Sequence, residues 1–187
     1  SVPHGKRKAL STANQRQHYI DICNIVNGDV SAEVIATDYE GMIKEGEELA
    51  ALNPHIVVKI PCIADGIKAI KYFTSKGIRT NCTLVFLPGS MLAAKAGATY
   101  VSPFVGRLDD ISSDGVELIA QIVSIYRTYG FKTSAGSSIR HTQHIIACAE
   151  VGADVVTCPL SAIKASEAPV DRLRSGTFLA DYKRVNG

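Results

Sequence analysis

The sequence has no strong excess of charge of either sign and no long apolar run. Its 20 Lys and Arg residues and 18 Asp and Glu residues leave a net charge of +2, too little for the positive field that attracts nucleic acid. The one basic cluster, Lys6 to Lys8, is short and lies near the start, where such clusters are usually solvated. No apolar stretch approaches the roughly 20 residues that cross a membrane. We therefore expect neither nucleic acid nor a membrane as a partner.

The sequence also lacks the close cysteine pairs of disulfide frameworks and zinc sites. Its cysteines are Cys23, Cys62, Cys82, Cys148 and Cys158. An odd number of widely spaced cysteines favours reduced thiols. His141 and His144 have an i, i+3 spacing, but no third metal ligand is evident. Residues 1–6 contain no apolar core of a secretory signal. We expect a cytoplasmic protein with no metal site.

What the sequence does have is a regular alternation of apolar, β-branched runs with segments of helical period. The expected strands are 30–36, 56–61, 79–86, 98–106, 132–138 and 154–159. The expected helices between them are 39–52, 65–76, 89–96, 115–129 and 142–151, and four of them end at Gly77, Gly97, Gly130 or Gly152. Units of about 25 residues in this order predict an α/β fold with a parallel sheet.

Two parallel architectures fit this pattern, an open doubly wound sheet and a (βα)8 barrel. Residues 56–60 are too continuously apolar for a sheet with one face in water. An open sheet usually carries a glycine-rich phosphate-binding turn, and the sequence contains neither GxGxxG nor GxxxxGK[ST]. The barrel is therefore favoured, although six strands are expected where a barrel has eight.

One residue stands out from these buried strands. Lys59 interrupts the apolar run 56–61, where desolvation favours the neutral amine that a Schiff base requires. The alternative is a structural salt bridge to Glu33 on the neighbouring strand. Further polar residues, Asn81, Thr83 and Ser102, occupy corresponding places on other strands. Together they indicate a polar barrel interior around one lysine, a pattern that favours a functional site.

A second group of residues is cationic. Arg107 follows an expected strand, and Ser138 and Arg140 lie where a strand passes into a helix N-terminus. Such a turn offers backbone N–H groups to an anion, and two arginines would complete a phosphate site. In the alternative reading Arg107 pairs with Asp109 or Asp110 and Arg140 faces water. We favour phosphate binding.

Several of these segments resemble a known family. Residues 57–61, 80–86, 94–107 and 138–140 are similar to the small transaldolases, class I aldolases related to fructose-6-phosphate aldolase. The likeness runs from about residue 15 to 183. It implies a (βα)8 TIM barrel that moves a dihydroxyacetone unit between sugar phosphates, with no metal or organic cofactor. It also implies a homo-oligomer, often a decamer, with the segment 178–183 as a C-terminal helix that packs on a neighbour.

The resemblance assigns roles to individual residues. Lys59 would form the Schiff base with the ketose carbonyl, while Glu33 and Thr83 would hold a water molecule that relays protons. Asn81 would bind the dihydroxyacetone hydroxyls, with Ser102 beside it.

The remaining roles concern phosphate binding and the choice of reaction. Arg107, Ser138 and Arg140 match the family's phosphate site. Glu33 and Phe104 are of the transaldolase type, whereas fructose-6-phosphate aldolase has glutamine and tyrosine there. Transfer is therefore favoured over free aldol cleavage.

The chain departs from the family pattern at its start. The family opens with a strand that bears a catalytic aspartate and a second strand that carries Thr-Thr-Asn-Pro; here residues 1–14, an atypical arm, replace both. Segments 87–90, 133–136 and 167–175 also look shorter. We expect a barrel domain over 15–187 whose first two strands are absent from the given sequence. We favour a sequence from which these strands were left out over a protein that itself lacks them. If the chain is this short, weak catalysis or a catalytically inactive sugar-phosphate-binding or assembly module is the alternative.

Overall fold

The computed structural model describes residues 12–103, 115–139 and 142–166. The site candidates Phe104, Arg107 and Arg140 and the expected helix 178–183 lie outside these residues. Of the expected arm 1–14, only residues 12–14 are described, and they form the start of a helix. None of the described helices is both long and apolar enough to cross a bilayer.

The core of the molecule is a parallel sheet of six strands. They are β1 (Val30–Glu33), β2 (Ile56–Pro61), β3 (Thr80–Thr83), β4 (Tyr100–Ser102), β5 (Ser134–Ser138) and β6 (Val155–Thr157). Their order in the sheet is the order in the sequence, β1-β2-β3-β4-β5-β6. A doubly wound sheet reverses its strand order at a switch point, so this order excludes that architecture. The expected α/β class and parallel sheet are confirmed.

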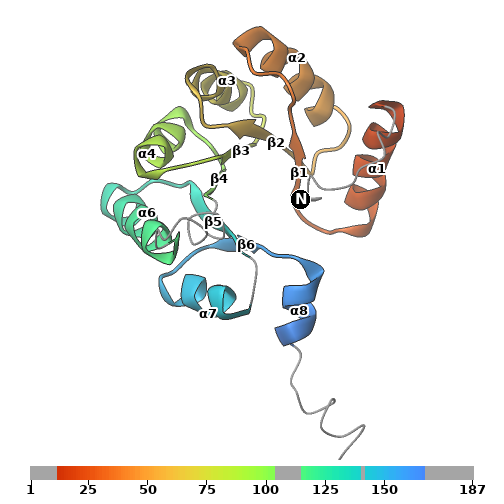
Figure 1. Cartoon of the computed structure of the whole chain (residues 1–187). Helices are drawn as coiled ribbons and strands as arrows, with labels where there is room; N and C mark the ends of the chain where they lie inside the picture. Colours follow the sequence, from red (N-terminus) through yellow and green to blue (C-terminus); the bar gives the residue numbers. More distant parts are fainter. Residues whose placement is uncertain (1–11, 104–114, 140–141, 167–187) are drawn as a thin grey trace, which may run out of the picture.

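The helices lie along one side of this sheet. They are α1 (Thr12–Ile25), α2 (Tyr39–Ala50), α3 (Ala64–Ser75), α4 (Leu87–Ala96), α6 (Gly115–Tyr129), α7 (Thr142–Glu150) and α8 (Leu160–Ser166). Figure 1 shows them as an outer arc, with the strands inside and none of the described helices on the inner side of the sheet. The described fold is therefore a curled half-barrel, consistent with part of a TIM barrel.

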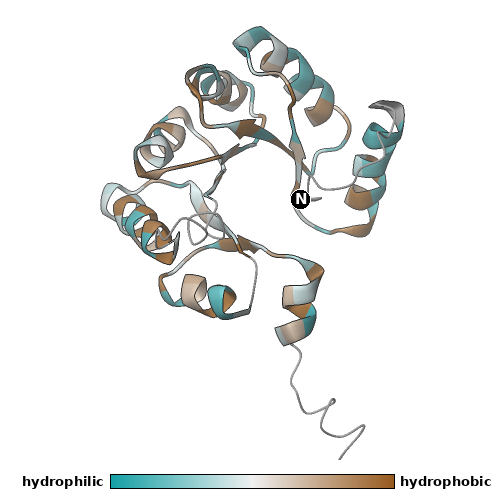
Figure 2. Ribbon diagram, viewed as in Figure 1, coloured by the Kyte–Doolittle hydropathy of each residue, from teal (hydrophilic) through white to brown (hydrophobic). Residues whose placement is uncertain are grey.

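The strand register sorts side chains to the two faces of the sheet. Glu33 pairs with Lys59, and Lys59 pairs with Asn81, so these three residues form one row across β1, β2 and β3. Because side chains alternate along a strand, Ile60 and Cys82 point the other way. Both are fully buried in the core between sheet and helices. Figure 2 shows apolar segments on the strands and both apolar and polar segments along the helices.

Helix α3 illustrates how the outer layer packs. Ala69, Ile70 and Phe73 share one side of the helix at helical spacing and are fully buried. A Cβ at Gly46 of α2 would lie 2.4 Å from the Phe73 ring, so only glycine allows the ring to approach this closely. Burying a side chain of this size contributes about 1.5–3 kcal/mol to folding.

The helix ends were predictable from single residues. Gly77, Gly97, Gly130 and Gly152 all have positive φ, as expected for glycines that end helices. Asp38 caps α2, its carboxylate accepting a hydrogen bond from the backbone N–H of Gly41 at 2.9 Å.

Other boundaries differ from expectation. The strand expected over 79–86 is only Thr80–Thr83, because Leu84 has a φ of 60° and turns the chain out of the sheet. The helices α1 and α8 were not anticipated. α1 carries few apolar residues in a helical stripe, and of its described side chains Cys23 and Tyr19 join a small cluster with Ala32 and Ile56.

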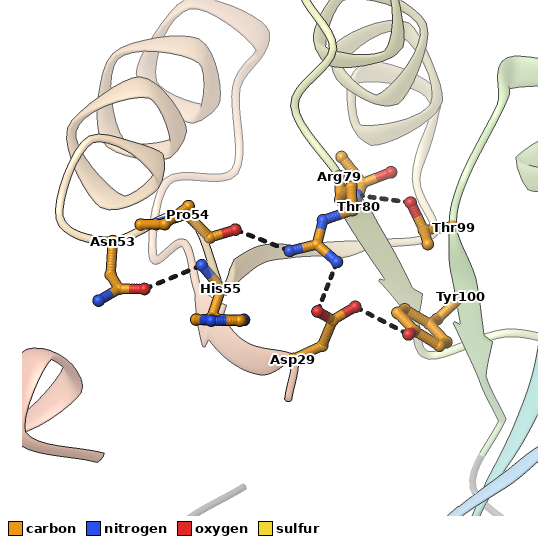
Figure 3. A network of polar contacts seen from close by, with 8 residues as sticks. All are labelled: Asp29, Asn53, Pro54, His55, Arg79, Thr80, Thr99 and Tyr100. Carbon is orange, nitrogen blue, oxygen red and sulfur yellow. Dashed lines mark hydrogen bonds and ion pairs between the residues drawn. The ribbon is translucent and has the colours of Figure 1, made fainter. Parts of the chain in front are cut away.

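The amino ends of the strands are joined by a polar network, shown in Figure 3. Asp29, directly before β1, accepts hydrogen bonds from the guanidinium of Arg79 and, at 2.8 Å, from the hydroxyl of Tyr100. The second Nη of Arg79 donates to the carbonyl of Pro54 at 2.7 Å. These contacts link the amino ends of β1, β2, β3 and β4. The carboxylate raises the pKa of the Tyr100 hydroxyl, because the phenol donates its proton to Asp29.

Candidate active site

The site is centred on Lys59, on the inner side of β2 near the carboxyl ends of the strands. Its Nζ lies 3.1 Å from Oε2 of Glu33, as the register predicts for neighbouring strands. The Lys59 side chain is 13% exposed and that of Glu33 45% exposed. The salt bridge of the structural interpretation is therefore present, and it joins a largely buried amine to a half-exposed carboxylate. The amine is also within reach of a molecule that enters from the inner side.

Asn81 lies next to Lys59 in the same row and is buried. Its Oδ1 accepts a hydrogen bond from the hydroxyl of Ser102 at 2.9 Å, and its Nδ2 donates to the hydroxyl of Ser31 at 3.1 Å. The structure therefore brings together Lys59, Glu33, Asn81 and Ser102, as the sequence suggested, and adds Ser31.

Thr83 completes the polar inner side near the carboxyl end of β3. Its hydroxyl is buried and has no hydrogen-bond partner among the described residues. Thr80 and Ser137 also have such hydroxyls, so the property alone does not mark a site. Thr83 differs because its register partner is Ser102 and its side chain shares a face with Asn81. Thr83 therefore belongs to the same face of the sheet as Asn81, and its hydroxyl keeps unused hydrogen-bonding capacity.

Of the residues of the expected phosphate site, the structure describes only Ser138. Ser138 is half-buried at the carboxyl end of β5, and its backbone N–H donates to the carbonyl of Pro103 at 3.2 Å. It thus lies at the same end of the sheet as Lys59. Arg107, Arg140 and Phe104 fall outside the described residues.

Two thiols near the site were not anticipated as a pair. Cys62 directly follows β2, and its side chain hydrogen-bonds to that of Cys82 on β3. This hydrogen bond lowers the pKa of the Cys62 thiol to about 7 and, together with burial, raises that of Cys82. The pair could have been predicted from strand alternation, because residues 60, 62 and 82 all point to the outer face of the sheet.

One surface hollow lies elsewhere. A groove of about 470 Å³ runs between α2 and α3 and is lined by Tyr39, Glu47 and Tyr72 among others. It lies on the outer, helical side, and its polar side chains belong to the surfaces of α2 and α3. We place the site by its chemistry, at the inner side of the sheet. Within the described ranges no group of three His, Cys, Asp or Glu side chains suits a metal ion.

The fold and the site together define a class: a singly wound βα protein with a lysine at the carboxyl end of its inner face. Its family is given by sequence comparison. The family model "Transaldolase/Fructose-6-phosphate aldolase" matches residues 7–176. The chain belongs to this family.

Curated relatives support the same assignment. A protein of Phocaeicola vulgatus is 74% identical over 177 residues, covering 93% of this chain and 81% of its own length. One from Bacteroides thetaiotaomicron is 73% identical over 185 residues, covering 97% of this chain and 85% of its own. One from Cytophaga hutchinsonii is 66% identical, with coverage of 93% and 81%. All three are named probable transaldolase.

A comparison of structures supports the fold alone. FabK from Thermotoga maritima superposes with a TM-score of 0.55 over 81% of this chain and 47% of that chain, at 12% sequence identity. At this identity the similarity concerns the arrangement of strands and helices and carries no information on the reaction.

Proposed function

We propose that this protein is a transaldolase that moves a dihydroxyacetone unit between sugar phosphates. In this reaction the neutral amine of Lys59 attacks the C2 carbonyl of a ketose phosphate, and water leaves to give an iminium ion. A base takes the proton of the C4 hydroxyl, the electron pair of the C3–C4 bond passes to the iminium as the bond breaks, and an aldose phosphate departs with its new aldehyde group. The three-carbon enamine that remains attacks the aldehyde of an acceptor, and hydrolysis of the new iminium frees Lys59.

The observation that carries the proposal is the setting of Lys59. Its amine lies in a row between a carboxylate and a buried amide, on a face that default barrel packing would fill with Val, Ile and Leu. A structural ion pair alone would need neither Asn81 nor Ser102 beside it. Membership of the family supplies the reaction for which such a row is suited.

The neighbouring groups suit the proton transfers and the binding of hydroxyls. Glu33, at 3.1 Å from the amine, can take protons from Lys59 or from a water molecule, and Thr83 can hold that water. Asn81 and Ser102 are placed to bind the hydroxyls of the three-carbon unit. Each of these roles is part of the proposal.

The phosphate group of the substrate would bind at Arg107, Ser138 and Arg140. Phe104 would replace the tyrosine that releases free dihydroxyacetone in the aldolase, so that transfer prevails. We further propose sedoheptulose 7-phosphate and glyceraldehyde 3-phosphate as substrates, with erythrose 4-phosphate and fructose 6-phosphate as products, in the pentose phosphate pathway.

The finer features of the fold and assembly belong to the same proposal. We take 15–187 as one domain and the six described strands as six of the eight in a (βα)8 barrel, a homo-oligomer in solution. The five cysteines are present as thiols and not as disulfides, which supports a cytoplasmic location.

A transfer assay tests the proposal. Purified protein is incubated with sedoheptulose 7-phosphate and glyceraldehyde 3-phosphate, and erythrose 4-phosphate and free dihydroxyacetone are both quantified. We expect erythrose 4-phosphate without free dihydroxyacetone. The variant Lys59→Arg keeps the charge opposite Glu33 but cannot form the Schiff base, so it should be inactive, while the exposed control Lys68→Arg should be unaffected. Free dihydroxyacetone in proportion to turnover would instead indicate the aldolase, and no turnover would indicate an inactive binding module.

A further inference from the structure

The amide of Asn81 is held on two sides by hydroxyl groups. Its Nδ2 donates to Ser31 at 3.1 Å and its Oδ1 accepts from Ser102 at 2.9 Å. A primary amide has two N–H donors and two acceptor lone pairs. These two contacts therefore leave one N–H and one lone pair for a bound molecule. Asn81 is only 9% exposed, so those groups can serve only what lies on the inner side of the sheet.

Ser31 reaches Asn81 across the strand that bears the lysine. It lies on β1 two residues before Glu33 and so shares the inner face with it. β2 is placed between β1 and β3, and a hydrogen bond from β3 to Ser31 must cross the inner face of β2 beside Lys59. Ser31 thus ties the strand with the carboxylate to the strand with the amide.

The two hydrogen bonds restrain the Asn81 amide more than either one alone would. The χ2 torsion of asparagine is broad, so an amide held only by Ser102 could turn about that single hydrogen bond. The second contact at Ser31 fixes the plane of the amide. With Ser31 accepting from Nδ2 and Ser102 donating to Oδ1, the pair holds the amide in this plane.

We infer that Ser31 is a positioning residue for the reaction, acting through Asn81 on the hydroxyl groups of the three-carbon unit. The inference rests on the proposed function for the identity of that unit. The hydrogen bond between Asn81 and Ser31, and its position beside Lys59, come from the structure. Ser31 is not expected to touch the substrate's phosphate, since Ser138 lies on β5, beyond β3 and β4 in the sheet.

The test is a double-mutant cycle with a conservative variant. Ser31→Ala removes the acceptor of the Asn81 amide, and Ser31→Thr keeps a hydroxyl there. Ser137→Ala is a matched control, because it removes a buried strand hydroxyl that has no partner among the described residues. Each is assayed for kcat/KM in the transfer reaction and for inhibition by inorganic phosphate. Ser31→Ala is also made in an Asn81→Ala background.

We expect Ser31→Ala to lower kcat/KM about tenfold, the value of one neutral hydrogen bond. Ser31→Thr should restore most of this loss, and Ser137→Ala should match the wild type. The phosphate inhibition constant should not change. In the Asn81→Ala background, Ser31→Ala should have no further effect. Wild-type activity in Ser31→Ala, or a full tenfold loss in the Asn81→Ala background, would overturn the inference.

A crystallographic comparison keeps the inference separate from the proposed function. We expect the Asn81 amide to occupy one plane in wild-type crystals, and to rotate or show two conformers in Ser31→Ala. If the wild type shows no transfer, the proposed function fails, and this comparison alone decides whether Ser31 holds the amide. An unchanged Asn81 amide in Ser31→Ala would overturn the positioning role whatever the activity.

Discussion

Removing the carboxylate of Asp29 should weaken the fold without affecting the reaction. Its oxygens accept hydrogen bonds from Arg79 and Tyr100 at the amino ends of the strands (Figure 3). A hydrogen bond to a charged group contributes about 1.5–3 kcal/mol. The side chains of Arg79 and Asp29 are 38% and 23% exposed, so the ion pair itself adds at most about 1 kcal/mol. We expect Asp29→Ala to lower the free energy of unfolding by about 2–3 kcal/mol.

The variant Asp29→Asn removes the negative charge but keeps a side chain of similar size and shape. The asparagine oxygen can still accept from Tyr100, so a loss of about 1 kcal/mol is expected. Urea unfolding of both variants and of Tyr100→Phe gives these values, and the Asp29→Ala, Tyr100→Phe cycle should show a coupling of about 1 kcal/mol.

The activity of the Asp29 variants bears on the placement of the site. Catalysis in βα barrels lies at the carboxyl ends of the strands, while the amino ends serve stability. At a temperature where both proteins are folded, Asp29→Ala should keep the wild-type kcat/KM. A large loss of activity together with unchanged stability would refute the division between the two ends.

Two further predictions concern the surroundings of β2. A Cβ at Gly66 would lie 2.0 Å from the carbonyl oxygen of Pro61, so Gly66→Ala must displace the end of β2. We expect the free energy of unfolding in urea to fall by about 1–3 kcal/mol and kcat to decrease. Wild-type stability and kcat in Gly66→Ala would contradict this close packing. Because the hydrogen bond with Cys82 lowers the pKa of Cys62 to about 7, its alkylation by iodoacetamide should rise through about pH 7 and then level off. Cys82→Ala should shift that rise to higher pH; an unshifted rise would contradict the contact.

Much of the fold was readable from the sequence because its signals are local. The helix 115–129 is observed as predicted, and the glycines at the helix ends have the positive φ that was expected. The curvature and the consecutive strand order are not local properties, and the absence of a phosphate-binding turn and the family resemblance pointed to them. Helix α1 was missed because its apolar residues are few and form no clear stripe.

The site was partly readable for the same reason. Lys59 and Asn81 stood out as polar residues inside apolar strands, and parallel pairing predicted that Glu33 would lie beside the lysine. Ser31 did not stand out, since serine is common in strands and its contact with Asn81 spans 50 positions in the sequence. Contacts of this kind depend on the register of three strands, which composition and periodicity do not determine.

The central claim is that Lys59 forms a Schiff base and retains three carbons of a sugar phosphate. The most direct measurement is the intact mass of the protein after incubation with fructose 6-phosphate and borohydride, followed by peptide mapping against an untreated control. We predict a mass increase of one reduced three-carbon unit, located on Lys59 and absent in Lys59→Arg. No adduct, or an adduct on another lysine, would contradict the account.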